Sequence, residues 1–66
     1  MNKVKGYRTM LGLTQDEMAK KLGVSTPTYR TYEDDPKKMS IETAKHFVEI
    51  INEVDKTITL NDVFFN

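Results

Sequence analysis

Four residues between positions 26 and 31 have types and spacing that suit contact with another molecule. A spacing of i, i+1, i+4 and i+5 places them on one face of a helix, away from its apolar positions: Thr26, Pro27, Arg30 and Thr31. Threonine offers a hydroxyl and a methyl group, and arginine can make two hydrogen bonds to a guanine edge. These types suit DNA bases, although a solvated helix face would show the same pattern.

The sequence lacks most residue types that catalytic and metal sites need. It has no cysteine and one histidine, His46, so a zinc site of Cys and His ligands and a thiol nucleophile are excluded. No paired carboxylates fall on an architecture that would form a cleft. We therefore expect that the protein is not an enzyme and that it binds no metal, cofactor or small-molecule ligand.

The length of the chain predicts a single domain over residues 1–66. No repeat or linker divides it, and no apolar run approaches the roughly 18 residues of a membrane span. The first six residues show no apolar stretch like that of a signal peptide. We expect a cytoplasmic domain with no membrane partner.

Start and stop signals divide the chain into helices. Apolar residues at 4, 7 and 11 followed by Gly12 predict one helix. A capping box over 14–17 begins a second, which Gly23 ends. Ser25 caps a third, which closes at 34–36 because proline disfavours the helical conformation in the residue before it.

The C-terminal half predicts two further helices. Ser40 caps one of them, and Thr59 caps a short last turn carrying Leu60, Val63 and Phe64. The apolar face expected for the helix after Ser40 is Ile41, Ala44, Phe47, Val48, Ile51 and Val54. The predicted fold class is therefore all-α, a bundle of about five short helices.

Only Gly23, Val24 and Ser25 separate the second and third predicted helices. A connection of this length that contains glycine is typical of a helix-turn-helix. In that motif the first helix braces the second, whose outer face is free to enter a major groove.

The charged residues are unevenly distributed along the chain. The formal net charge is zero, which argues against nucleic acid. However, residues 1–38 hold eight basic and five acidic residues, and residues 39–66 hold two basic and five acidic ones. The two parts thus carry +3 and −3, an asymmetry seen in chains that bind nucleic acid.

The segment from Gly12 to Glu33 resembles the lambda-repressor/Cro-like helix-turn-helix proteins of phages and bacteria. The resemblance is carried by GLTQDEMAKKLGVS at 12–25, by Thr28-Tyr29 and by Tyr32-Glu33. It continues weakly at 58–65, which resembles the closing helix of the family, and so covers most of the chain.

The resemblance implies roles for individual residues. Gln15 would bind a phosphate of the DNA backbone and brace the third helix, the recognition helix. Ser25 would cap that helix and approach the same DNA strand. Thr26, Pro27 and Thr31 fall on base-reading positions of the family, with Arg30 beside them.

Arg8 and Glu33 fall on the positions of a partly buried ion pair that ties the first helix to the third. The pair makes physical sense, because a buried acid needs a partner. The alternative is that Glu33 lies exposed near a helix C-terminus, where its charge is unfavourable.

The chain departs from the family after Glu33. Asp34 and Asp35 stand where relatives often have glycine, and the turn is expected to survive because aspartate tolerates the left-handed conformation better than most residues. Their carboxylates would repel a phosphate backbone, so Lys37 and Lys38 are expected to face the phosphates. Pro27 cannot hydrogen-bond a base and would contact a thymine methyl or stiffen the helix.

The predicted function is a sequence-specific transcriptional regulator, a phage or prophage-type repressor that binds double-stranded operator DNA. It would act as a homodimer, weak in solution, through residues 54–65, and would lie with the nucleoid of a bacterial or phage-infected cell. The alternative is a helix-turn-helix interaction module, antirepressor-like or antitoxin-like, with little DNA binding. Neutral charge, Pro27 and the two aspartates favour that alternative.

Overall fold

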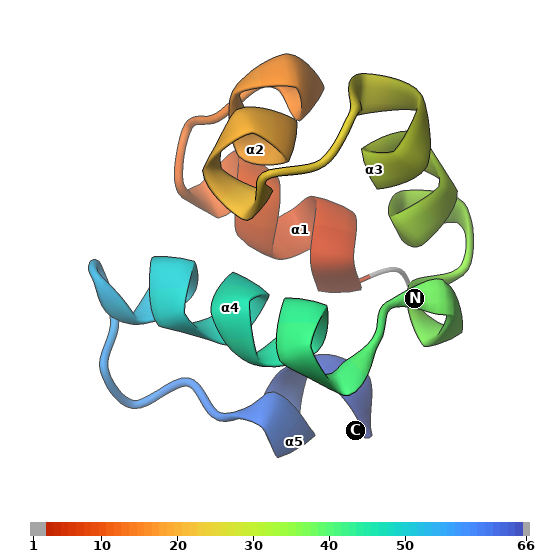
Figure 1. Cartoon of the computed structure of the whole chain (residues 1–66). Helices are drawn as coiled ribbons and strands as arrows, with labels where there is room; N and C mark the ends of the chain where they lie inside the picture. Colours follow the sequence, from red (N-terminus) through yellow and green to blue (C-terminus); the bar gives the residue numbers. More distant parts are fainter. Residues whose placement is uncertain (1–2, 66) are drawn as a thin grey trace.

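The computed structural model describes residues 3–65, and residues 1, 2 and 66 of the predicted single domain lie outside the described part. Five α-helices and one short 3-10 helix make up the regular structure of residues 3–65, so the prediction of an all-α fold is confirmed (Figure 1). The elements are α1 (Lys3–Met10), α2 (Gln15–Leu22), α3 (Thr26–Asp34), η1 (Pro36–Lys38), α4 (Ile41–Asn52) and α5 (Leu60–Phe64). None of these helices is long and apolar enough to cross a membrane.

The ends of α2 follow from its sequence. Thr14 Oγ1 accepts a hydrogen bond from the Glu17 amide at 3.1 Å, and the Glu17 carboxylate accepts one from the Thr14 amide at 2.9 Å. This capping box satisfies amides that have no partner inside the helix. Gly23 ends the helix at φ +75°, a left-handed conformation that glycine adopts at little cost.

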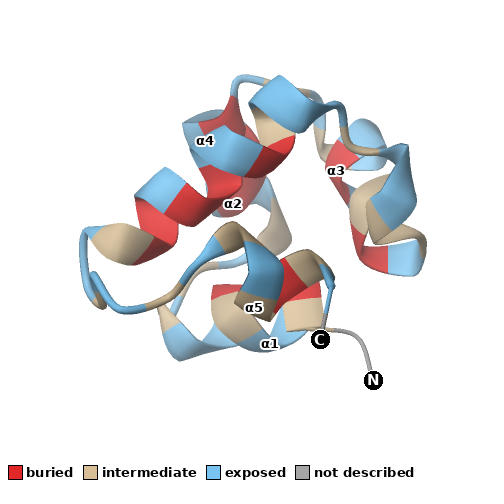
Figure 2. Ribbon diagram, turned by 90° about the horizontal axis from the view of Figure 1, so that it is seen from below, coloured by how far each residue is buried: buried red, intermediate tan, exposed pale blue. Residues whose placement is uncertain are grey.

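The core lies where α1, α2, α3 and α4 meet (Figure 2). Its largest fully buried side chains come from all four helices: Val4, Met18, Tyr29, Phe47 and Ile51. Each large apolar side chain removed from water contributes about 1.5–3 kcal/mol, which favours packing the short helices together.

Two expected members of the α4 apolar face are exposed. Ile41 is 63% exposed because it is the first residue of α4, at the edge of the core. Val54 is 70% exposed because α4 ends at Asn52 and Val54 lies in the following turn. Ile50, which was not predicted, is buried instead.

The chain turns after α3 without using the left-handed conformation that Asp34 and Asp35 could tolerate. No residue other than glycine has a positive φ between residues 3 and 65, and Asp35 is extended at φ −146°. Pro36 explains the extended conformation, since it disfavours helical geometry in the preceding residue. The Asp35 carboxylate accepts a hydrogen bond from the Lys37 amide at 3.2 Å and caps η1.

The C-terminal segment is held by side-chain hydrogen bonds and ring packing. Asn52 Nδ2 donates to the carbonyl oxygens of Asp55 and Ile58, both at 2.9 Å. The Phe64 and Phe47 rings pack edge to face with their centroids 6.3 Å apart, and this contact joins α5 to the core.

Candidate nucleic-acid interface

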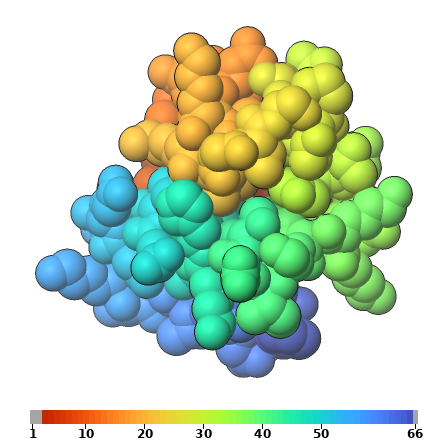
Figure 3. All heavy atoms as spheres, viewed as in Figure 1, coloured from red at the N-terminus to blue at the C-terminus, as the bar shows by residue number. Residues whose placement is uncertain are grey.

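Helices α2 and α3 form a helix-turn-helix at one end of the molecule. They pack on each other, and in Figure 3 their atoms make up the upper part of the face, on the far side of α4 from α5. Ser25 Oγ accepts a hydrogen bond from the Thr28 amide at 3.3 Å and so begins α3 directly after the turn. Tyr29 and Glu33 point into the protein, which leaves the opposite face of α3 outward.

The four residues predicted to read bases share that outward face. Pro27 and Arg30 are exposed, while Thr26 and Thr31 are half-buried. The Thr31 hydroxyl donates to the Pro27 carbonyl oxygen at 3.1 Å. Its only hydroxyl proton is therefore used within the helix, and its methyl group and oxygen lone pairs remain to meet a ligand.

The predicted phosphate contacts are spread over three elements. Lys37 and Lys38 are exposed on η1, just beyond α3. The Ser25 hydroxyl donates to Thr28 Oγ1 at 2.8 Å, so it would have to turn away from Thr28 to donate to a phosphate. Asp34 is also exposed and brings a negative charge near the same end of α3.

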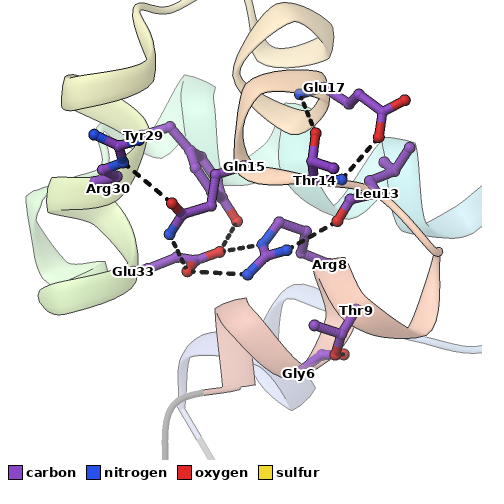
Figure 4. Close-up of polar contacts among 10 residues, drawn as sticks. All are labelled: Gly6, Arg8, Thr9, Leu13, Thr14, Gln15, Glu17, Tyr29, Arg30 and Glu33. Carbon is purple, nitrogen blue, oxygen red and sulfur yellow. Dashed lines mark hydrogen bonds and ion pairs between the residues drawn. The ribbon is translucent and has the colours of Figure 1, made fainter.

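Gln15 lies between the buried and the exposed parts of the site (Figure 4). Its side-chain Nε2 donates to Glu33 Oε1 at 2.9 Å, and its Oε1 accepts from Arg30 Nε at 3.1 Å. The first residue of α2 thus binds α3 at two points. One of the two Nε2 protons remains for another acceptor.

A buried ion pair joins α1 to α3 beneath this face. Arg8 Nε donates to Glu33 Oε2 at 2.5 Å and its Nη2 donates to Oε1 at 3.4 Å, while Nη1 donates to the Leu13 carbonyl at 2.9 Å. The Tyr29 hydroxyl donates to Glu33 Oε2 at 2.6 Å. Together with Gln15, these donors surround the carboxylate of Glu33. Glu33 is a buried residue, with only 4% of its surface exposed.

The donors around Glu33 shift its ionisation and that of its neighbours. Burial by itself would raise the pKa of Glu33, but the hydrogen bonds from Arg8, Tyr29 and Gln15 outweigh it and the pKa is lowered. Burial and then the bond to Glu33 raise the pKa of Tyr29, so its hydroxyl keeps its proton. The network is therefore an arginine cation and a carboxylate anion with a neutral tyrosine.

Two of these hydrogen bonds were not predicted from the sequence. The hydroxyl of Tyr29 was not predicted to bind Glu33, although their i, i+4 spacing places them one turn apart. The link from Gln15 to Arg30 was also missed, because residues 15 positions apart on different helices give no periodic signal.

The sequence matches a helix-turn-helix family model and is similar to two named proteins. A family model described as helix-turn-helix matches residues 4–56. The chain is 34% identical to Antitoxin HipB of Escherichia coli O6:H1 over 61 residues, which are 92% of this chain and 62% of that protein. It is 44% identical over 50 residues to an uncharacterized HTH-type transcriptional regulator of Methanocaldococcus jannaschii, covering 70% of this chain and 76% of the relative. No solved structure matches it.

Proposed function

The chain belongs to the helix-turn-helix family, of the lambda-repressor and Cro type that residues 12–33 resemble, and from that premise we propose that it represses transcription as a dimer on a palindromic operator. The family match and the similarity to a transcriptional regulator support a function in DNA binding and regulation. The observation that carries the proposal is the outward face of α3, where Thr26, Pro27, Arg30 and Thr31 lie on a helix held from beneath by buried hydrogen bonds.

The proposed mechanism is steric. A dimer would place one α3 helix in each of two successive major grooves, about 34–36 Å apart, and polymerase would be excluded from the occupied DNA. Base contacts would come from the outward face of α3, and phosphate contacts from Gln15, Ser25, Lys37 and Lys38. Phosphate contacts fix the position of the protein, whereas base contacts select the sequence.

We propose that the dimer forms through the apolar surface between α5 and the start of α4. Phe65 is 70% exposed and Ile41 is 63% exposed. Both line a groove together with Pro36, Lys37, Met39, Ala44, Leu60 and Phe64. A two-fold contact uses the same patch on both copies, so Phe65 of one copy would lie against the groove of the other. We propose that this dimer is weak in solution and is completed on DNA.

The test is a selection of bound sites from random duplex DNA, followed by affinity measurements on the recovered duplex and on a scrambled one. Recovered sites should contain an inverted repeat. The logarithm of the affinity should fall linearly with the logarithm of the salt concentration, with a slope of about −0.9 for each phosphate neutralised. Recovery of no preferred sequence would refute sequence-specific repression.

A protein-interaction module is the second candidate function. It is favoured by the 34% identity to an antitoxin, by the net charge of zero and by the exposed Asp34 beside the α3 terminus. As such a module, the chain would bind duplex DNA without sequence preference or not at all. Equal affinity for recovered and scrambled duplexes would move this candidate ahead. For either function we propose a location in the cytoplasm, with the nucleoid for the repressor.

A further inference from the structure

We propose that Gln15 is a specificity-determining residue that acts through Arg30: it holds the Arg30 guanidinium in one orientation, so that its two terminal nitrogens form a fixed fork toward a guanine edge. This inference rests on the proposed function, since it names how one base is read. Gln15 is a positioning residue in this scheme, and Arg30 makes the contact.

The Gln15 amide has only one possible orientation in this site. Its NH2 group lies 2.9 Å from Glu33 Oε1, and a carboxylate accepts hydrogen bonds but cannot donate them. Glu33 is itself held by Arg8 and by the Tyr29 hydroxyl, and its lowered pKa keeps it ionised at neutral pH. The carbonyl oxygen of Gln15 must therefore point the other way, toward Arg30.

Arg30 Nε donates a hydrogen bond to Gln15 Oε1, with 3.1 Å between the two atoms. A guanidinium is planar and carries five N–H donors in a fixed fork, so a hydrogen bond at Nε, together with the covalent link of Nε to the side chain, restricts the directions in which Nη1 and Nη2 can point. Within residues 3–65, Arg30 makes no other hydrogen bond or ion pair, and its side chain is exposed. The terminal nitrogens are thus the donors that remain.

The remaining donors restrict how Arg30 can read a base. Arginine binds guanine by two hydrogen bonds to O6 and N7. With Nε occupied, that pair of bonds must come from Nη1 and Nη2, end-on. An arginine already held in place also loses less side-chain entropy on binding than a free one does. Gln15 should therefore raise the preference for guanine at one base pair.

The first experiment measures Arg30 in the free protein by nitrogen relaxation of its Nε–H group. We compare the wild type with Gln15→Met, which keeps the length of the side chain but loses both amide hydrogen bonds. Lys20→Ala is the control, because Lys20 is exposed on the same helix. The order parameter should exceed about 0.6 in the wild type and the control and fall below that value in Gln15→Met. A mobile Nε–H group in the wild type would overturn the proposal.

The second experiment is a double-mutant cycle on the duplex that the wild-type protein selects. Arg30→Ala should lower the affinity for this duplex roughly 5- to 150-fold. Replacing the contacted guanine in the duplex should lower the affinity of the wild-type protein by a similar factor. Gln15→Met should lower affinity about three- to tenfold. In the Gln15→Met background, the penalty for Arg30→Ala should shrink by at least about threefold. Independent effects would overturn the proposal, because they would show that Gln15 does not act through Arg30.

The two experiments separate this inference from the proposed function. If no duplex is selected, the proposed function fails and so does the reading of guanine, whatever the relaxation data show. If a duplex is selected but Gln15→Met leaves guanine preference unchanged, only the inference fails. Melting temperatures of all variants show that each is folded under the binding conditions.

Discussion

Replacing Arg8 with methionine should destabilise the domain by about 3–5 kcal/mol, because Glu33 would keep a buried charge without its main partner. Methionine retains an unbranched side chain and fills most of the space of the arginine stem. Domains of 66 residues have a free energy of unfolding of roughly 3–10 kcal/mol. The expected loss is therefore a large part of the total.

The contacts that would remain favour the lower end of that range. Glu33 would still accept hydrogen bonds from the Tyr29 hydroxyl at 2.6 Å and from Gln15 Nε2 at 2.9 Å. A hydrogen bond to a charged group contributes about 1.5–3 kcal/mol, so these two donors partly replace the lost solvation. We expect a loss near 3 kcal/mol, larger than that for an exposed lysine such as Lys20, whose removal should cost under about 0.5 kcal/mol.

Removing both charges should restore stability. In the double variant Arg8→Met, Glu33→Leu no buried charge is left unpaired, and apolar replacements of buried ion pairs are often neutral. The double variant should lose less stability than the sum of its single variants, with a coupling of about 1–3 kcal/mol. Urea denaturation followed by circular dichroism measures all four free energies of unfolding.

The effect of pH has a defined sign. Because the pKa of Glu33 is lowered in the fold, its ionised form contributes stability above the unfolded value of about 4.3 and loses it as pH falls through the folded pKa. Without Arg8 the pKa of Glu33 should rise. The stability gap between wild type and Arg8→Met should thus be widest at neutral pH. It should narrow as pH falls through the raised pKa of Glu33 in the variant and then through its lowered pKa in the wild type. A gap independent of pH, or zero coupling in the cycle, would refute the account of Glu33 as a buried anion.

Three further predictions concern the core, the dimer and the DNA contacts. Leu22→Ala should cost roughly 2–5 kcal/mol, because Leu22 is only 7% exposed, and a melting temperature within a degree or two of wild type would contradict this. Phe65→Ser should reduce dimer formation in sedimentation velocity while leaving the melting temperature nearly unchanged, since Phe65 is 70% exposed; unchanged sedimentation and DNA affinity would remove it from the interface. In a salt series on selected and scrambled duplexes, Lys37→Ala should weaken both equally and reduce the salt slope by about 1 per half-site. Thr31→Ala should cost about 1–3 kcal/mol on the selected duplex alone, and equal losses on both duplexes would show that α3 does not read sequence.

Local signals in the sequence predicted the helices well. Caps such as Thr14 and Ser25, and the left-handed Gly23, act within a few residues, so their effect can be worked out without the rest of the fold. The exposure of Ile41 depends instead on where α4 meets its neighbours, which periodicity does not specify. The effect of Pro36 on Asp35 is also local and was predicted: Asp35 is not helical but extended, and neither Asp34 nor Asp35 adopts the left-handed conformation that aspartate tolerates.

The candidate site was predictable as a set of positions, but most of its side-chain hydrogen bonds were not, apart from the Ser25 cap and the Arg8–Glu33 pair that the family resemblance implied. Spacing alone assigns Arg30 and Thr31 to the outward face of α3, because a helix has a fixed period. The bond from Arg30 to Gln15 joins two long side chains on different helices. Its existence depends on how closely α2 and α3 approach and on which rotamers the core leaves open, and neither follows from one sequence.

Different residues of α3 hold the helix in the fold and face outward. The buried network of Arg8, Tyr29 and Glu33 holds it from the side opposite to its outward face. Tyr29 and Glu33 anchor the helix from below, so Thr26 and Pro27 can be exchanged without disturbing the groups that hold it. Altered binding preferences should therefore be reachable through substitutions that leave folding nearly intact. Arg30 is the exception, because its guanidinium is tied to Gln15 and any change there would also release the amide. New specificities of this scaffold should arise more readily at the beginning of α3 than at its middle.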